Sequence, residues 1–282
     1  MGRQASHHYI PASYLAGFTE GETKESSFWS VPKDNKKSFK TSPIKSCKKR
    51  DYYTIEHENS LLVEHWYANK IEPKIKKALE YVAIHKALPP KDEMQFLLLL
   101  AATLYLRTPS SRATREAPLK RTQEIVDGID KDVKISNRNA FKFNQTDLIT
   151  SELKLINTVM ECLSSKYYCL LISDDPNINF ITSDCPFLLM HPDSNLQYYG
   201  LNTKNIELSI PISKNAVLVG RNEEMKEGAF EANKKFVAAF NSNLISYTDK
   251  SFYSNQSKIY LLDDNGAPII WDINKLACSN AL

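Results

Sequence analysis

Two adjacent histidines near the start of the chain have the side chains and the position for proton transfer. His7 and His8 lie just before Pro11, and proline is favoured in the first turn of a helix, so a short helix is expected to start there. The positive end of a helix dipole disfavours imidazolium, so a histidine at this position stays neutral and can act as a general base or a ligand. In an extended segment the two rings point to opposite sides, so one of them is expected to enter a site. Alternatively, one histidine bonds the backbone of the first turn.

Arg107 ends the most apolar segment of the chain. Its permanently charged, planar guanidinium is suited to hold a phosphate or a carboxylate. Arg112 and Arg115 follow closely, and such a basic stretch suits a phosphate backbone. All three arginines are therefore predicted to bind substrate. The alternatives are an Arg107 that bonds the last helical carbonyls or pairs with a buried acid, and a basic helix face that is simply exposed to solvent.

Asp184 lies between two apolar runs, directly after a predicted strand. An acid in apolar surroundings can serve as a base, as a ligand for a divalent metal such as Mg²⁺ or Mn²⁺, or as a partner for Arg107. The neighbouring Ser183 is a candidate substrate-binding residue. Thr182, Ser183 and Asp184 also have the composition of a turn in which the aspartate bonds nearby backbone N–H groups, so this interpretation stays open.

Composition excludes several other classes of site. The chain has only 8 glycines in 282 residues and no G-x-G-x-x-G or G-x-x-x-x-G-K stretch, which argues against the common nucleotide-binding loops. Five widely spaced cysteines with no C-x-x-C pair are typical of reduced thiols in a cytoplasmic protein. The histidines show no zinc-binding spacing. The longest apolar run, 96–106, is too short to cross a bilayer, so no membrane association is expected.

The elements that must position these residues divide the chain into two parts. Helices are predicted near Pro11, at 59–86 with a break at Pro73, at 92–107, at 110–126, from a cap at Thr146, and at 230–247. A β-hairpin is predicted at 27–31 and 38–41. Further short strands are predicted at 168–173, 179–182, 187–190, 206–212, 216–219, 252–253 and 258–262. Helices first and strands later indicate an α+β protein, with a helical N-terminal part packed on a mostly antiparallel sheet in the C-terminal half. We expect a single domain over 1–282, helix-rich in 1–166 and strand-rich in 167–282.

Charge is distributed unevenly along the chain. Residues 1–121 contain 21 Lys and Arg against 13 Asp and Glu, a net charge of +8, and the remainder carries −5. A basic half can attract a polyanion, which makes RNA or DNA a candidate partner. The same split could instead hold two parts of one domain together.

Several stretches resemble the signatures of the bacterial domain of unknown function 4238 family. They are His7-His8-Tyr9-Ile10-Pro11 with Tyr14, Leu15 and Phe18; 39–43; Leu106-Arg107-Thr108-Pro109; 180–186; and 240–244. The order of the stretches along the chain is the one expected for the family. Two departures are that Cys185 stands where asparagine is expected and that Ala16-Gly17 replaces a more polar pair. The resemblance implies no established activity.

The leading hypothesis from the sequence is a nuclease, a hydrolase of nucleic-acid phosphodiesters, in a bacterial defence or toxin setting. In this hypothesis His7 or His8 moves the proton and Arg107 stabilises the developing charge, while Asp184 orients the histidine or binds a metal. One alternative is a non-catalytic binding protein in which the same residues form a buried structural network. Another is a protein that senses or hydrolyses a small anionic ligand held by Arg107.

Overall fold

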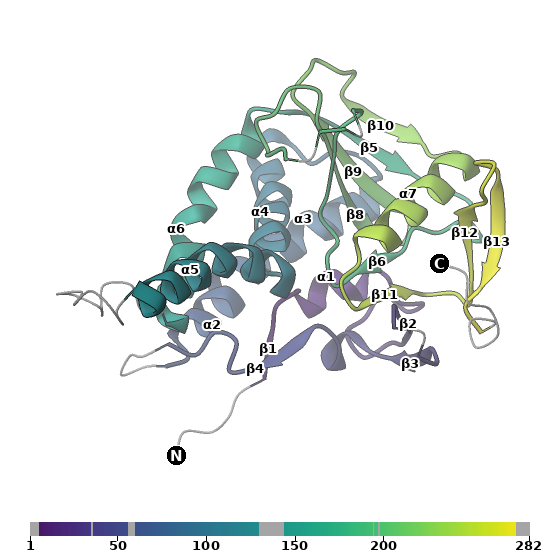
Figure 1. Ribbon diagram of the computed structural model, residues 1–282. Helices are drawn as coiled ribbons and strands as arrows, with labels where there is room; N and C mark the ends of the chain where they lie inside the picture. Colours follow the sequence, from purple (N-terminus) through teal and green to yellow (C-terminus); the bar gives the residue numbers. More distant parts are fainter. Residues whose placement is uncertain are drawn as a thin grey trace.

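A central five-stranded sheet organises the fold (Figure 1). The computed structural model describes residues 6–34, 36–55, 60–129, 144–193, 195–196 and 198–274. The central sheet has the strand order β10 (Gly228–Glu231), β5 (Tyr167–Ile172), β9 (Ala216–Arg221), β8 (Glu207–Ser213) and β7 (Leu188–Met190). Only the β10–β5 pair is parallel among these strands. The chain is therefore an α+β protein with a mostly antiparallel sheet in its C-terminal half, as predicted.

Both faces of the central sheet are covered. The helices on one face are α3 (Glu72–His85), α4 (Lys91–Arg107) and α6 (Gln145–Ser164), and α7 (Lys234–Tyr247) lies on the other (Figure 1). Along β9, Leu218 belongs to the core formed with α3, α4 and α6, whereas Val217 and Val219 belong to the core formed with α7. Successive side chains of a strand point to opposite faces, so the continuous apolar run of β9 serves two cores at once.

The N-terminal part also contributes strands, so sheets are not confined to the C-terminal half. A second sheet has the order β3 (Phe39–Thr41), β2 (Phe28–Pro32), β11 (Ser251–Ser254) and β6 (Thr182–Ser183). The predicted hairpin is present as β2 and β3. Strand β2 pairs antiparallel with β11, so an early and a late segment of the chain lie side by side in this sheet. Two further pairs are β1 (Ser6–His8) with β4 (Lys48–Arg50), and β12 (Lys258–Leu262) with β13 (Pro268–Asp272).

Most predicted helices are present, with corrections at their ends. The predicted 59–86 helix consists of α2 (Leu62–Trp66), a π-helical turn at Tyr67–Ile71 and α3, so its irregularity precedes Pro73. The N-cap of α6 is Asn144, not Thr146, because the Asn144 side chain accepts the Asp147 N–H. Residues 228–231 form β10, and α7 starts later, capped by Asn233. The predicted loop 127–145 lies mostly outside the described residues.

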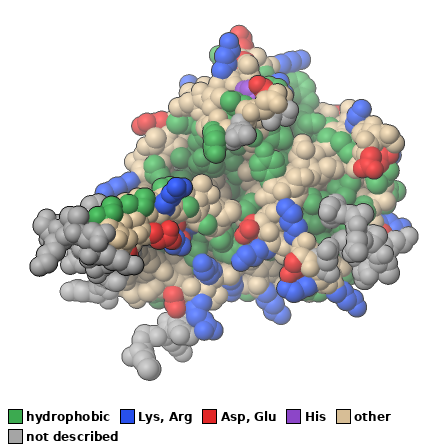
Figure 2. Space-filling model, in the orientation of Figure 1, with side chains coloured by type: hydrophobic (Ala, Val, Ile, Leu, Met, Phe, Trp, Pro, Cys, Tyr) green, Lys and Arg blue, Asp and Glu red, His purple; other side chains and the backbone are tan. Residues whose placement is uncertain are grey.

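Surface charges agree with a solvated basic edge. Figure 2 shows Lys and Arg side chains along the lower edge of the molecule, on the side where Figure 1 places β1, β3 and β4, with a few acidic side chains among them. Lys48, Lys49 and Arg50 of β4 are all exposed. None of the described helices is long and apolar enough to cross a membrane.

Candidate functional site

Strand β1 places the two histidines on opposite sides of the chain. It pairs antiparallel with β4, and strand alternation turns His7 inward, where it is 1% exposed, and leaves His8 partly exposed. The backbone N–H of Tyr53 donates to Nδ1 of His7 at 2.7 Å. Nε2 of His8 lies 3.3 Å from the carbonyl oxygen of Pro43. Only His7 therefore enters the interior.

Burial keeps both imidazoles neutral. Desolvation is the main reason that the pKa of His7 is lowered, and Arg107 adds to the effect while Asp51 opposes it. Desolvation, helped by the charge of Lys48, lowers the pKa of His8 to about 4. Both histidines are neutral, as predicted, but the cause is burial and not the dipole of the helix that follows. The helix that follows, α1 (Ala12–Ala16), has only 5 residues, too few for a substantial dipole.

Arg107 is fully enclosed at the end of α4, with 1% of its surface exposed. Its Nε donates to the hydroxyl of Tyr53 at 2.6 Å, and its Nη2 donates to the carbonyl oxygen of His8 at 2.6 Å. Its guanidinium carbon lies 3.8 Å from the centroid of the Tyr67 ring, a cation–π contact. Both acceptors are uncharged. In addition, no carboxylate among the described residues forms an ion pair with Arg107.

Polar atoms without partners surround this arginine. We call His7, Tyr53, Glu64, Tyr67 and Arg107 the arginine cluster. Four of its atoms are shielded from solvent and have no hydrogen-bond partner among the described residues: His7 Nε2, Glu64 Oε2, Tyr67 OH and Arg107 Nη1. Desolvation raises the pKa of Glu64, and the charge of Arg107 acts in the opposite direction. Tyr67 begins the π-helical turn, a feature often found at functional sites.

Asp184 takes part in a different set of contacts. It is 2% exposed, and its carboxylate accepts the backbone N–H groups of Asp249 at 3.0 Å, Lys250 at 2.8 Å and Ser251 at 3.2 Å. Burial nevertheless raises its pKa to about 6. These contacts hold the loop before β11, and none of the described hydrogen bonds joins Asp184 to His7, His8 or Arg107.

The other predicted site residues are also engaged in internal contacts. Ser183 is fully buried, and its hydroxyl accepts the backbone N–H of Cys185 at 3.0 Å. Arg112 donates to Glu152 at 2.8 Å, and Arg115 lies 3.5 Å from the same carboxylate. Both arginines belong to α5 (Pro109–Ile129). No group of three His, Cys, Asp or Glu in the described part of the chain is placed to hold a metal ion.

Hydrogen bonds connect the stretches that stood out in the sequence. Tyr14 and Thr182 share a hydrogen bond of 2.9 Å between their hydroxyl groups. Ser110, three residues after Arg107, shares one of 2.9 Å with the thiol of Cys185. Oδ1 of Asn241 accepts the backbone N–H of Ile181 at 3.1 Å. The early, central and late stretches thus form one largely buried framework.

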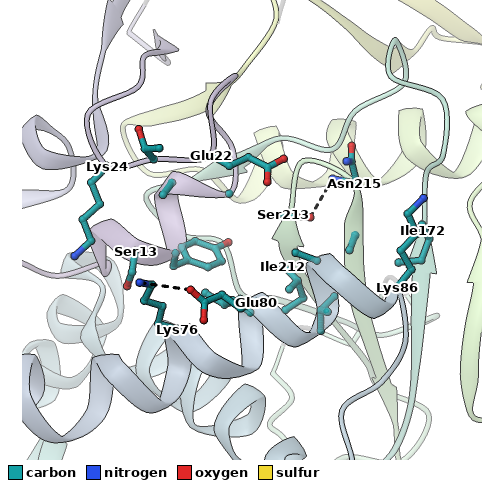
Figure 3. Close-up of a pocket in the computed structure, with 18 residues that line it drawn as sticks. Ser13, Glu22, Lys24, Lys76, Glu80, Lys86, Ile172, Ile212, Ser213 and Asn215 are labelled. Carbon is teal, nitrogen blue, oxygen red and sulfur yellow. Dashed lines mark hydrogen bonds and ion pairs between the residues drawn. The ribbon is translucent and has the colours of Figure 1, made fainter.

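An open cleft lies beside this framework, between α1, α3 and the central sheet (Figure 3). Its volume is about 460 Å³. The apolar part of its lining includes Leu79, Val82, Ala83, Ile172, Ile212 and Ala216. Tyr14 of α1, from the first of the signature stretches, and Gly17, directly after α1, line the opposite wall. A Cβ atom added at Gly17 would lie 3.4 Å from the Cβ of Ser213, an ordinary van der Waals contact, so this end of α1 packs directly against β8.

Charged side chains surround the opening of the cleft. In Figure 3, Lys24 and Lys76 lie at one end and Lys86 at the other. Lys76 pairs with Glu80 at 3.4 Å, Lys86 with Asp174, and Glu22 with Lys214 at 3.0 Å. The ammonium group of Lys24 has no ion pair or side-chain hydrogen bond among the described residues.

Comparison with known proteins places the chain in a family. The family model for DUF4238, proteins of unknown function, matches residues 6–258. The chain belongs to the DUF4238 family. Neither the curated proteins nor the solved structures gave a match. The family resemblance expected from the sequence is therefore confirmed for this DUF4238 protein.

Sequence reasoning missed the cleft and part of the arginine cluster. Glu64 and Tyr67 lie in a segment predicted as an ordinary helix, and nothing in their spacing indicates that a π-helical turn brings Tyr67 beneath Arg107. The cleft residues come from α1 and the segment after it, from α3, and from β5, β8 and β9, and their types and spacing form no pattern in the sequence.

Proposed function

We propose that this DUF4238 protein binds a small molecule with an apolar body and an acidic group, and that the molecule occupies the cleft between α1, α3, β8 and β9. The observation that carries this proposal is the cleft itself. Its volume of about 460 Å³ lies within the range of about 300–1,000 Å³ that is usual for small-molecule sites. Among the classes considered from the sequence, this is nearest to the protein that senses a small anionic ligand, but here the ligand lies in the cleft and is not held by Arg107.

The floor of the cleft suits an apolar body. Ile172, Ile212 and Ala216 come from the central sheet, and Val82 comes from α3. All four side chains are buried in the core next to the cleft, so their positions are set by packing and do not depend on a ligand. A floor that is already formed reduces the ordering required on binding.

The charges around the opening favour an acid. Three lysines and two glutamates line the cleft, a net charge of +1. Each of these side chains except Lys24 is in an ion pair. The remaining uncompensated charge is therefore positive, and an acidic group placed near Lys24 would complement it.

The framework gives the signature stretches a role in this proposal. The wall formed by α1 is held from two sides, by the hydrogen bond between Tyr14 and Thr182 and by a backbone bond of 3.0 Å from the N–H of Lys214 to the carbonyl oxygen of Gly17. Loss of either contact would move α1 relative to β8 and change the width of the cleft. The buried signature residues thus support binding without touching the ligand.

The nuclease stays a prediction that the geometry supports less well. His7 and Arg107 are each 1% exposed, so a nucleic-acid backbone reaches neither of them in this conformation. Asp184 accepts three backbone N–H groups, and no hydrogen bond among the described residues joins it to either of them. Hydrolysis of RNA or DNA, with or without Mg²⁺ or Mn²⁺, would require these elements to separate. The defence setting depends on that activity.

The experiment that tests ligand binding uses 8-anilinonaphthalene-1-sulfonate, a fluorescent anion with an apolar body. We expect its fluorescence to rise on binding the wild-type protein, and decanoate to displace it more effectively than decanol does. Ala83 lines the cleft, whereas its neighbour Ile84 is 74% exposed and does not line it. Ala83→Trp should fill the cleft and weaken binding at least tenfold, and the matched control Ile84→Trp should bind as the wild type does.

Two results would contradict the proposal. If Ala83→Trp binds the probe as tightly as Ile84→Trp, the probe occupies another surface. If decanol competes as well as decanoate, the site does not recognise an acidic group. A melting temperature within about 2 °C of the wild type in both variants would show that the comparison reflects the cleft and not the fold.

A further inference from the structure

The arginine cluster contains three hydrogen-bond donors without acceptors. Nδ1 of His7 accepts the Tyr53 N–H, so the neutral ring carries its hydrogen on Nε2, which has no partner. Nη1 of Arg107 and the hydroxyl of Tyr67 are likewise shielded from solvent and without a partner among the described residues. Buried donors in folded proteins are almost always satisfied. The one acceptor without a partner in the cluster, Oε2 of Glu64, is too few for three donors, so a further acceptor is needed.

The three donors come from a small region. The guanidinium carbon of Arg107 lies 3.8 Å from the ring centroid of Tyr67 and 4.7 Å from that of Tyr53. The ring of His7 is stacked on Tyr53 with 6.1 Å between centroids. Three separate elements, β1, the π-helical turn and the end of α4, supply the donors.

The described hydrogen-bond acceptors of the Arg107 guanidinium are all neutral. Arg107 donates only to the uncharged hydroxyl of Tyr53 and the carbonyl oxygen of His8. The nearby Glu152 is shared between Arg112 and Arg115, so one carboxylate faces two guanidinium groups. Glu152 also acts on Arg107 electrostatically, and Arg107 acts on Glu64, whose Oε2 has no partner. A guanidinium with neutral acceptors on two sides and open donors on the third is suited to an anion.

We propose that Arg107 Nη1, Tyr67 OH and His7 Nε2 bind a small inorganic anion of halide size. The size follows from the enclosure: His7, Tyr67 and Arg107 are each about 1% exposed, which leaves no access for a nucleotide or a polymer. The chemistry follows from the donors, because a halide accepts hydrogen bonds from all directions and donates none. This site is distinct from the cleft and does not depend on the ligand proposed for it.

The anion would act as a structural ligand of the framework. It would connect β1 to the π-helical turn and to the end of α4, three segments that meet at Arg107. A ligand that binds only the folded state raises stability in proportion to the logarithm of its concentration. The stability of the protein should therefore depend on the identity of the anion and not only on ionic strength.

The test replaces gluconate, which is too large to be enclosed, by bromide at constant ionic strength and measures the melting temperature. We expect the wild-type melting temperature to rise by several degrees between 0 and 200 mM bromide. Tyr67→Phe keeps the ring and removes the donor, so its rise should be less than half that of the wild type. The matched control Tyr198→Phe, at a side chain that is 88% exposed, should behave as the wild type does.

Glu64→Gln separates the anion from the alternative that Glu64 itself neutralises Arg107. If an anion is bound, removing the neighbouring negative charge strengthens binding, and the bromide-dependent rise becomes larger in Glu64→Gln. A wild-type melting temperature that is independent of bromide, or the same rise in Tyr67→Phe as in Tyr198→Phe, would overturn the proposal. So would crystals grown in bromide without an anomalous peak near Arg107. Ala83→Trp fills the cleft and should leave the bromide effect unchanged. Failure of the anion proposal can therefore be distinguished from failure of the cleft proposal.

Discussion

The arginine cluster and the cleft are two neighbouring parts of the molecule with opposite properties. The cluster is rich in polar groups, includes the signature residues His7 and Arg107, and is closed to solvent. The cleft is open, mostly apolar and charged only around its opening. His7 and Arg107 therefore lie where a substrate has no access, while the cleft is formed mainly by side chains with little chemistry of their own. Ser110, Arg115 and Cys185 line another open cavity, of about 690 Å³. In this protein, buried residues that stand out in the sequence hold the framework together.

The largest effect that would sharpen this comparison is expected for Arg107→Ala. The substitution removes the hydrogen bonds to Tyr53 and His8 and the stacking on Tyr67, and it leaves the buried partners unsatisfied. We expect the free energy of unfolding to fall by about 3–5 kcal/mol. Urea denaturation measures this change, and Arg121→Ala, at an exposed position of α5, should change stability by less than about 0.5 kcal/mol. Similar values for both variants would show that the cluster does not hold the fold.

A smaller effect, dependent on pH, is expected for Asp184. Its pKa in the folded protein, about 6, lies above its ordinary value of 3.8, so the folded state binds the proton more tightly than the unfolded state does. The stabilisation from this proton is complete below about pH 4 and is lost as the pH rises through 6. The difference of about two pKa units corresponds to about 3 kcal/mol at most.

Asp184→Asn should lack this contribution. We expect the unfolding free energy of the wild type, measured with urea from pH 4 to pH 7, to fall relative to that of Asp184→Asn as the pH rises. Parallel curves for the two proteins would mean that the three backbone N–H donors from 249–251 keep the carboxylate ionised. Asp184 would then be a purely structural turn residue at all pH values in this range.

The smallest effect is expected for the charge at the opening of the cleft. Lys24→Gln removes the one lining charge without an ion pair, and because Lys24 is exposed, solvent screens its contribution to about 0.2–1 kcal/mol. We expect the affinity for decanoate to fall about two- to fivefold, with no change for decanol. Isothermal titration calorimetry measures both, and Lys45→Gln, at an exposed lysine that does not line the cleft, is the control. Equal affinities for decanoate in all three proteins would remove Lys24 from the site.

The fold was largely predictable because its strongest signals are local. The long apolar segment that became α4 and the short apolar runs of β8 and β9, bounded by turn residues, indicate their own structure. Two features were not predictable for physical reasons. The π-helical turn at Tyr67–Ile71 has no pattern that distinguishes it from an α-helix, and β13 pairs with β12 through an exposed apolar stretch, Ile269 and Ile270, that lacks alternation.

The candidate site was predictable only in its polar half. Histidine, arginine and aspartate stand out between apolar residues, so His7, Arg107 and Asp184 could be identified from the sequence. Their partners could not, because the contact of Arg107 with His8 spans 99 residues, and that of Asp184 with Lys250 spans 66. The cleft could not be found at all, since its shape depends on how α1 and α3 pack against the sheet and not on any residue type.

The most direct test of the central claim, that the cleft and not the arginine cluster binds the ligand, is a titration of isotope-labelled protein with decanoate, followed by backbone amide chemical shifts. The largest changes should occur at 79–86 on α3 and at 212–216 on β8 and β9, while the amides of His8 and Tyr53 remain unchanged. Changes centred on His8 and Tyr53, or the absence of any change at millimolar decanoate, would contradict the account.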